Sequence, residues 1–271
     1  MSDYATRFGG IARLYSSAGL ERLHSAHVCV IGIGGVGSWA AEALARSGIG
    51  KLTLIDLDEV CITNVNRQLP ALSSNVGTPK ISVMEERIRG INPEATIHSL
   101  LSFFNETTAA EILATHFDYV LDAIDSVRQK ALLIAHCFKR NIPIVTTGGA
   151  GGRRDPTQIQ VGDLAQSSHD RLLLATRTEL RKYHGFSKGG NTSFGVDAVF
   201  STEPQVFPSD NGAICEQPAN RENLRLNCES GYGTATFVTG AFGFVAASIV
   251  VRKIAAESED QARQASPPKS R

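Results

Sequence analysis

The chain has 271 residues, 42% of them hydrophobic and 20% charged, which is enough to bury the core of an ordinary globular domain. Its 27 Lys and Arg balance 27 Asp and Glu, so a bulk electrostatic attraction to nucleic acid or acidic membrane is excluded and any such partner must meet a local patch. The five cysteines are odd in number and never spaced C-x-x-C, which predicts reduced thiols, no structural zinc and a cytoplasmic protein.

Short β-branched runs alternate with helical stretches along the first 161 residues. The runs predict strands over 27–31, 51–55, 96–99, 119–122, 142–146 and 157–161. The stretches between them predict helices over 36–46, 80–90, 107–115 and 127–140. This alternation is typical of an α/β fold with a doubly wound, mainly parallel sheet.

The pattern is less regular after residue 152, where we expect a C-terminal α/β extension. A helix is predicted over 170–183 and a strand over 196–200, followed by an uncharged apolar run over 233–251. That run favours a buried helix closing the sheet, because glycines and threonines interrupt its first half; weak membrane association is the alternative. Polar residues 256–271 predict a disordered tail, so 1–255 is expected to be one domain.

A glycine fingerprint lies between the first predicted strand and the first predicted helix. Residues 28–37 read Val-Cys-Val-Ile-Gly-Ile-Gly-Gly-Val-Gly, and the glycines of the G-x-G-x-x-G pattern and its extra member are Gly32, Gly34, Gly35 and Gly37. Such glycines allow a tight turn and let phosphate approach the backbone at a helix N-terminus, which here begins near Ser38. Asp56, at the end of the second strand, is placed to bind a ribose. These features predict an adenosine nucleotide and leave NAD and ATP both open.

Three later segments favour ATP. They are Asn64-Val65-Asn66-Arg67-Gln68, Gly77-Thr78-Pro79-Lys80 and Asp122-Ala123-Ile124-Asp125-Ser126. A triphosphate attacked at its α-phosphate benefits from Arg, Lys and a carboxylate-held Mg²⁺, whereas a dinucleotide needs no further cations. Taken singly, Arg67 and Lys80 also fit surface charges, and one of the two acids before the next helix is expected to be its N-cap.

Taken in order, these motifs resemble the adenylating domain of the ubiquitin-activating-enzyme-like superfamily of ThiF type, over about residues 7–254. Within it, the tract Val145-Thr-Thr-Gly-Gly-Ala-Gly-Gly and the segments starting at Asp155 and Arg7 look most like the branch of tRNA threonylcarbamoyladenosine dehydratases. The resemblance implies ATP-dependent activation of the threonylcarbamoyladenosine carboxylate in the tRNA anticodon loop. Cyclisation would follow, with release of AMP and net loss of water.

The resemblance also implies roles for individual residues. The implied nucleotide-binding set is Gly32, Gly34, Gly35, Gly37, Ser38, Asp56, Asp58, Asn64, Asn66, Arg67, Gln68, Lys80, Asp122 and Asp125. Within this set Asp56 would bind the ribose. Asn66, Arg67 and Lys80 would bind the phosphates, and Asp125 would be the magnesium ligand.

Members of the superfamily bring an arginine from the opposite subunit into each site, which implies a homodimer. Arg13 is the candidate here, with Arg7 left open. The catalytic candidates are therefore Arg67, Lys80, Asp125, Arg13 and Cys228. Cys228 lies in a polar turn and is the thiol best placed to act as a nucleophile or with a sulfur-relay protein partner. An inert thiol is favoured, because the cyclisation has an internal nucleophile.

The segment 151–190 is the candidate substrate contact. It contains seven cations, Arg153, Arg154, Arg171, Arg177, Arg181, Lys182 and Lys188, against the four acids Asp155, Asp163, Asp170 and Glu179. Such a basic segment suits tRNA phosphates, with Tyr183 and Phe186 available to stack a base. A solvated helix face is the equally weighted alternative.

Three other functions stay open. The first is adenylation of the C-terminus of a ubiquitin-like sulfur carrier, although relatives with that activity often hold zinc on two C-x-x-C pairs that this chain lacks. The second is a non-catalytic nucleotide-binding partner, against which Arg67, Lys80 and Asp125 argue. An NAD-dependent oxidoreductase is least favoured, because no His paired with a neighbouring acid follows the fifth strand.

Overall fold

The computed structural model describes residues 3–189, 192–209, 212–215 and 233–256. Its strands are β1 (His27–Ile31), β2 (Lys51–Ile55), β3 (Thr96–Leu100), β4 (Tyr119–Asp122), β5 (Ile144–Thr147), β6 (Ile159–Asp163), β7 (Asp197–Ser201), β8 (Phe207–Pro208) and β9 (Ile214–Cys215). Its α-helices are α1 (Tyr4–Ser25), α2 (Gly37–Arg46), α3 (Lys80–Ile91), α4 (Ala109–Ile112), α5 (Val127–Lys139), α6 (Arg171–Tyr183) and α7 (Thr236–Ala255). Short 3-10 turns include η1 (Ile62–Asn64), η2 (Ser73–Asn75) and η3 (Pro156–Gln158).

One seven-stranded sheet organises the molecule. Its strand order is β3-β2-β1-β4-β5-β7-β6, and every pairing is parallel except that of β6 with β7. The chain therefore starts in the middle of the sheet, winds to one edge, returns and winds to the other. The predicted doubly wound, mainly parallel fold is confirmed, and the switch of direction falls between β1 and β4, where ligands of such sheets bind.

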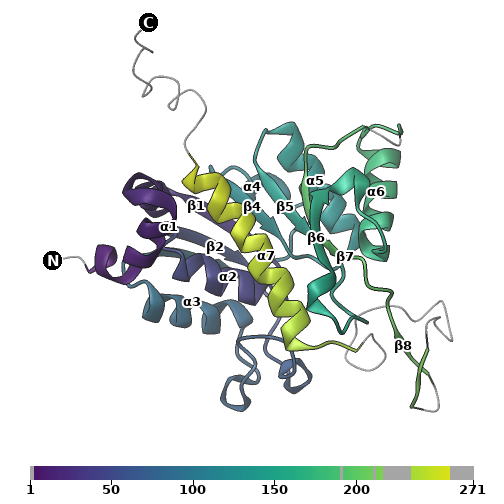
Figure 1. The fold of residues 1–271 in the computed structure, drawn as a ribbon, viewed down its shortest axis with the longest axis horizontal. Helices are drawn as coiled ribbons and strands as arrows, with labels where there is room; N and C mark the ends of the chain where they lie inside the picture. Colours follow the sequence, from purple (N-terminus) through teal and green to yellow (C-terminus); the bar gives the residue numbers. More distant parts are fainter. Residues whose placement is uncertain (1–2, 190–191, 210–211, 216–232, 257–271) are drawn as a thin grey trace, which may run out of the picture.

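Helices cover both faces of the sheet (Figure 1). Along β1, Val28 and Val30 face the core formed with α2, α3 and α7, whereas Cys29 and Ile31 face the core formed with α4, α5 and α6. Successive side chains of a strand point to opposite faces, so a continuous apolar run is what a strand buried on both sides requires.

Helix α7 is a core helix, as the sequence predicted. It packs against α2, α1 and the central strands, and its inward side chains, such as Phe242 and Val250, are fully buried. By length and composition it is the one helix among the described ranges that is apolar enough to cross a membrane, yet 56% of its most apolar window is buried inside the protein. Its apolar character is therefore explained by its packing on the sheet.

Several sequence-based boundaries are wrong. The predicted helix over 107–115 contracts to α4, four residues long, and the predicted strand over 157–161 begins as the turn η3 before β6. Helix α1 was not predicted at all: it has a kink at Ser16, and Tyr4, Phe8 and Leu20 form a small core of their own. The predicted tail lies outside the described residues from 257 onward.

Candidate functional site

The glycine loop joins β1 to α2 at the carboxyl edge of the sheet. Gly32 has φ +90°, and a Cβ there would lie 2.8 Å from the carbonyl oxygen of Ala123. A Cβ on Gly37 would lie 1.8 Å from the carbonyl oxygen of Gly32. Glycine is therefore required at both positions, once for the backbone conformation and once for the closeness of helix and turn.

The loop leaves polar groups without partners. The N-cap residue of α2, Val36, makes no side-chain capping bond. The Ser38 N–H donates to the Gly34 carbonyl at 3.2 Å, so the other N–H groups at the start of the helix are the ones available to an anion. A Cβ on Gly34 would have Gln68 Nε2 as its nearest neighbour, at 3.9 Å, and the buried Oε1 of Gln68 has no hydrogen-bond partner. Since buried polar atoms are nearly always paired, this arrangement fits a bound polar ligand.

Asp56 lies beside this loop at the end of β2. Its Oδ2 accepts a hydrogen bond from the Ile33 N–H at 2.6 Å, and its Oδ1 accepts one from the Asp58 N–H at 2.8 Å. Burial raises the pKa of Asp56, while the nearby charge of Lys80 and these N–H groups act in the opposite direction. Each oxygen keeps a lone pair for a hydroxyl, which suits the predicted ribose contact.

Lys80 begins α3 and is buried, with 5% of its surface exposed. Its Nζ lies 2.7 Å from Asp58 Oδ2, so the segment after β2 and the start of α3 are joined by an ion pair. Asp58 is exposed, and a more negative group such as phosphate can compete for the ammonium.

Asn66 and Arg67 lie in the segment after η1. Arg67 Nη1 donates to the Thr63 carbonyl at 2.8 Å and to Asn66 Oδ1 at 3.1 Å. Asn66 Nδ2 donates to the Thr234 carbonyl at 2.8 Å, which ties this segment to the start of α7. All these contacts are exposed, so the guanidinium is held at the surface of the site.

The two acids after β4 have different environments. Asp122 is fully buried: its Oδ2 lies 2.8 Å from Lys130 Nζ and accepts a hydrogen bond from Thr146 Oγ1 at 2.6 Å. Asp125 is exposed and, within the described ranges, no hydrogen bond or ion pair involves its carboxylate. The charge of Asp122 is compensated inside the protein, so Asp125 is the acid of the two whose carboxylate is free to meet a ligand.

The predicted capping role of these acids is wrong. The N-cap residue of α5 is Ser126, which makes no side-chain capping bond, and Asp122 Oδ1 accepts from the Ile124 N–H instead. Lys130, which compensates Asp122, was missed. Its place at the end of the first turn of α5, eight residues after a buried Asp, is the signal that was available.

Two further members of the predicted set act inside the protein. Ser38 does lie at the start of α2, but its buried hydroxyl donates to the Gly34 carbonyl and accepts from the Leu69 N–H. Asn64 is buried, with Oδ1 accepting from the Cys61 N–H. These side chains shape the loop and the Asn-x-Asn-Arg-Gln segment, and their contact with the nucleotide stays a prediction.

Arg13 lies on α1, remote from the glycine loop of its own chain. Tyr4 of α1 donates to the carbonyl of Gly48, two residues after the end of α2. Arg22 of α1 donates to the carbonyl of Ala255, the last residue of α7. Both contacts are at the C-terminal ends of α2 and α7, whereas the glycine loop precedes the N-terminus of α2; Figure 1 shows α1 beside the C-terminal end of α7. The Arg13 side chain is exposed, and Arg7 is paired with Asp3 at 2.8 Å. Cys228 lies outside the described residues.

Only some of the cations in the predicted basic segment 151–190 are exposed at the surface. Arg153 is buried and donates to the carbonyls of Gly149, Ser201 and His169, and Arg177 is buried against Ser167. Neither can meet a substrate phosphate. Phe186 is buried as well, so it cannot stack a base as predicted, whereas Tyr183 is 61% exposed.

Arg153 instead organises the glycine-rich tract after β5. It forms a buried ion pair with Asp170, at 3.4 Å, and Asp170 Oδ2 also accepts from the Gly149 N–H. Burial raises the pKa of Asp170, which the Leu173 N–H and Arg153 counteract. The N-cap of α6 is thereby fixed at the carboxyl edge of the sheet, next to the strand β5.

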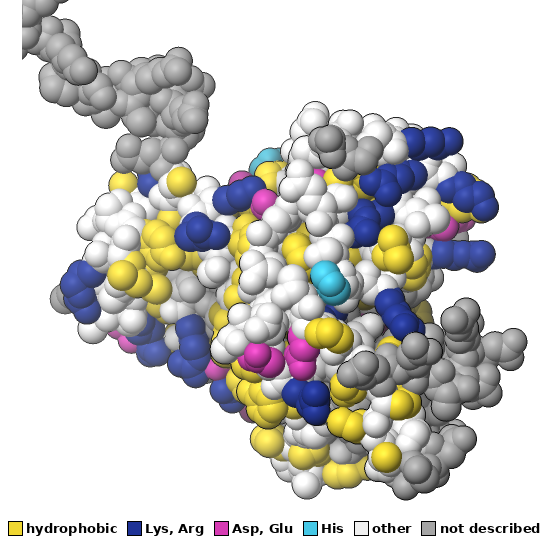
Figure 2. Space-filling model, turned by 45° about the vertical axis from the view of Figure 1, so that its right-hand side comes forward, with side chains coloured by type: hydrophobic (Ala, Val, Ile, Leu, Met, Phe, Trp, Pro, Cys, Tyr) yellow, Lys and Arg dark blue, Asp and Glu magenta, His cyan; other side chains and the backbone are white. Residues whose placement is uncertain are grey.

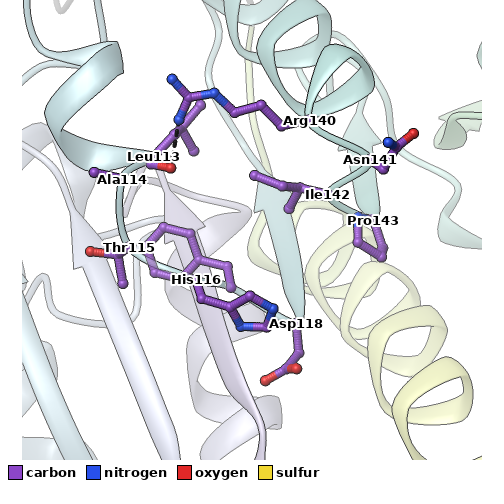
Figure 3. A pocket seen from close by; sticks show the side chains of 10 residues that line it. Leu113, Ala114, Thr115, His116, Asp118, Arg140, Asn141, Ile142 and Pro143 are labelled. Atoms are coloured by element: carbon purple, nitrogen blue, oxygen red, sulfur yellow. Dashed lines mark hydrogen bonds between the residues drawn. The ribbon is translucent and has the colours of Figure 1, made fainter.

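A cavity of about 460 Å³ lies elsewhere, between the turns that precede β4 and β5 (Figure 3). His116, Asp118 and Arg140 line it, and Arg140 Nη1 donates to the Leu113 carbonyl at 2.6 Å. These turns are at the amino edge of the sheet, opposite to the glycine loop. The cavity therefore has no part in the site described above.

Comparison with known proteins agrees with this geometry. The model of the ThiF family matches residues 9–267. The chain is 52% identical to the tRNA threonylcarbamoyladenosine dehydratase of Escherichia coli, over 94% of this chain and 96% of that protein, and 40% identical to the Bacillus subtilis enzyme of that name, over 89% and 91%. A crystal structure of the E. coli dehydratase, TcdA, in complex with ATP superposes with a TM-score of 0.84 and 47% identity, covering 98% of this chain and 99% of that one.

Proposed function

The chain belongs to the ThiF family, and from this we propose that it is a tRNA threonylcarbamoyladenosine dehydratase that uses ATP. The observation that carries the proposal is the site itself: the uncapped start of α2 follows a glycine loop, and Asp56, Arg67, Lys80 and Asp125 lie around it. The same chain is similar to tRNA threonylcarbamoyladenosine dehydratases over nearly its whole length. Its reaction takes place on tRNA, which favours a cytoplasmic location.

The site fits ATP in its donors and its charges. The first turn of α2 offers N–H groups to phosphate, and Asp56 is the acceptor at the ribose. Arg67 and Lys80 carry the positive charge that a triphosphate needs as negative charge develops on the oxygens around its α-phosphorus. Gln68 and Asn66 supply amide groups at the same edge.

The site also fits one magnesium ion. Mg²⁺ is usually held by one or two carboxylates together with phosphate oxygens and water, and when bound it neutralises charge on the phosphates. Asp125 is the carboxylate available for it, since Asp122 is paired with Lys130. No group of three or more His, Cys, Asp or Glu side chains is gathered among the described residues, and such a magnesium site does not need one.

The chemistry has two steps. A carboxylate oxygen of threonylcarbamoyladenosine attacks the α-phosphorus of ATP, and pyrophosphate leaves with its electron pair. A nucleophile within the modified nucleoside then attacks the activated carbonyl, and AMP leaves with the oxygen. Arg67 and Lys80 stabilise the first leaving group, and the balance is the loss of one water from the nucleoside.

The tRNA surface that we propose is the outer face of α6. Arg171, Leu174, Thr178 and Lys182 are exposed at helical spacing on that face, and Tyr183 follows them. Figure 2 shows Lys and Arg side chains gathered on the side of the molecule that carries α6. Asp170 fixes the start of α6 at the carboxyl edge of the sheet, and the thirteen residues of the helix extend about 20 Å from there. The outer face of α6 can therefore bind phosphates of the tRNA backbone at increasing distance from the site.

We propose that the protein works as a homodimer in which Arg13 completes the partner's site. Large apolar side chains are exposed on the segment after β2 and on α7, namely Ile62, Val65, Leu72, Val76, Phe237 and Phe244. The segment after β2 contacts the start of α7 through Asn66 and Thr234, and Figure 2 shows hydrophobic atoms at the lower end of the molecule. Such a surface supports self-association. A sulfur-relay partner acting through Cys228 has no comparable support.

The test of the function is mass spectrometry of tRNA nucleosides. Purified protein, ATP and Mg²⁺ are incubated with tRNA that bears threonylcarbamoyladenosine, and we expect a nucleoside lighter by one water, with AMP and pyrophosphate formed in equal amount. ADP and phosphate would contradict the mechanism, and an unchanged nucleoside would contradict the substrate. Omission of ATP is the control.

A further inference from the structure

Trp39 is the single tryptophan of the sequence, and its indole is bonded to the segment that carries Arg67. Trp39 Nε1 donates a hydrogen bond to the main-chain carbonyl of Arg67 at 3.0 Å. Trp39 lies in the first turn of α2, whose start is the phosphate site. One side chain therefore joins the helix that receives phosphate to the residue whose guanidinium is expected to bind it.

Helix α7 supports this bond from behind. The carbonyl of Arg67 also lies 3.3 Å from Thr239 Oγ1, and the Thr239 methyl packs against Gly35 of the loop. A Cβ on Gly243 would lie 2.5 Å from the Val36 carbonyl and 3.0 Å from Trp39 Cβ, so glycine lets α7 approach α2 closely. The indole ring also packs against Phe244 in a T-shaped contact, with ring centroids 5.8 Å apart.

The small and hydroxylated residues that interrupt the apolar run of α7 thus face the site, and Thr236 likewise donates to the carbonyl of Asn66. A helix chosen for burial alone would not need hydroxyls there. Their carbonyl partners belong to two consecutive residues of the Asn-x-Asn-Arg-Gln segment. The hydroxyl groups of α7 therefore fix the position of the Asn-x-Asn-Arg-Gln segment relative to the glycine loop.

We propose that Trp39 is a positioning residue that acts through Arg67: its N–H fixes the Arg67 backbone so that the guanidinium reaches the phosphates bound at α2. The inference rests on the proposed function for the role of Arg67. It adds a residue that touches neither ATP nor the reacting atoms and that the sequence patterns did not indicate.

A double-mutant cycle on AMP formation tests the proposal. Trp39→Phe keeps a ring and removes the N–H, and we expect kcat/KM for ATP to fall about tenfold in the wild-type background and to stay unchanged in an Arg67→Ala background, because the two residues form one unit. Equal falls in both backgrounds would show a general structural role and overturn the proposal. Phe138→Leu is the control: it removes an exposed aromatic ring on α5, remote from Trp39 and Arg67, and should leave kcat/KM within twofold.

A second arm needs neither turnover nor substitution of the tryptophan. ATP should change the fluorescence of Trp39 in the wild-type protein, and the change should be lost in Arg67→Ala at ATP concentrations shown by calorimetry to saturate that variant. The same change in both proteins would overturn the proposal. If Trp39→Phe does not fold, this arm decides. A wild type that forms no AMP at all contradicts the proposed function, whereas the fluorescence arm still tests the link between Trp39 and Arg67.

Discussion

At the scale of single residues, Asp125 and Asp122 show how two acids three positions apart acquire different tasks. Asp125 is exposed and does not cap α5, so Asp125→Asn should leave the melting temperature nearly unchanged. In the proposed mechanism it removes the negative charge that would hold Mg²⁺, so AMP formation should fall on the order of a hundredfold. Thermal unfolding and a product assay on the same preparation check this. A large loss of melting temperature would instead assign Asp125 a structural role.

The buried charge of Asp122 is compensated by Lys130, and this pair predicts an effect on stability. Both side chains are fully buried, and removal of one partner leaves an uncompensated charge in the core. Lys130→Met should therefore lower the free energy of unfolding by about 3–5 kcal/mol, measured by urea denaturation. Lys139→Met is the control on the same helix, where the side chain is exposed and the expected loss is small. Equal stabilities of the two variants would refute the importance of the pair.

At the scale of an element, α6 divides into an inner and an outer face. Arg177 on the inner face is bonded to Ser167 and should not be used to test RNA binding, because its loss would disturb the fold. Arg171→Glu with Lys182→Glu, on the outer face, should weaken tRNA binding and reduce its salt dependence by about one unit of slope per cation, with ATP affinity unchanged. Filter binding at several salt concentrations measures this, with Arg252→Glu at the far end of α7 as the control. An unchanged slope would place the RNA elsewhere.

At the scale of the whole molecule, the proposed homodimer can be tested through Arg13, because α1 carries it away from the glycine loop of its own chain. Arg13→Ala and Lys80→Ala dimers should each be nearly inactive. In an equal mixture half of the dimers are mixed, and each of those has one site with Lys80 and a borrowed Arg13, so activity should return to about a quarter of wild type. Subunit exchange is first confirmed by native mass spectrometry of differently tagged chains. No recovery after exchange would mean that Arg13 acts within its own subunit or not at all.

The sequence by itself determined the sheet, the glycine loop and the family, because these depend on local patterns. An apolar run followed by closely spaced glycines and a helix is compatible with few folds. The strands β1, β2 and β4 have the bounds that their β-branched runs predicted. The kinked helix α1 escaped prediction, since its stability comes from contacts with Gly48 and Ala255, which are distant in the sequence.

The tertiary structure decided which polar residues are free to meet a ligand. Asp122 and Asp125 are chemically alike in the sequence, and so are Arg153 and Arg154. Their roles diverge because Asp122 and Arg153 are buried against the opposite charges of Lys130 and Asp170, whereas Asp125 is exposed and Arg154, 4.0 Å from Glu203, is 64% exposed. A buried charge must be paired, so the pairing partner determines which side chain remains available. The bond from Trp39 to the Arg67 carbonyl is a further case, since it joins residues 28 positions apart and leaves no local pattern in the sequence.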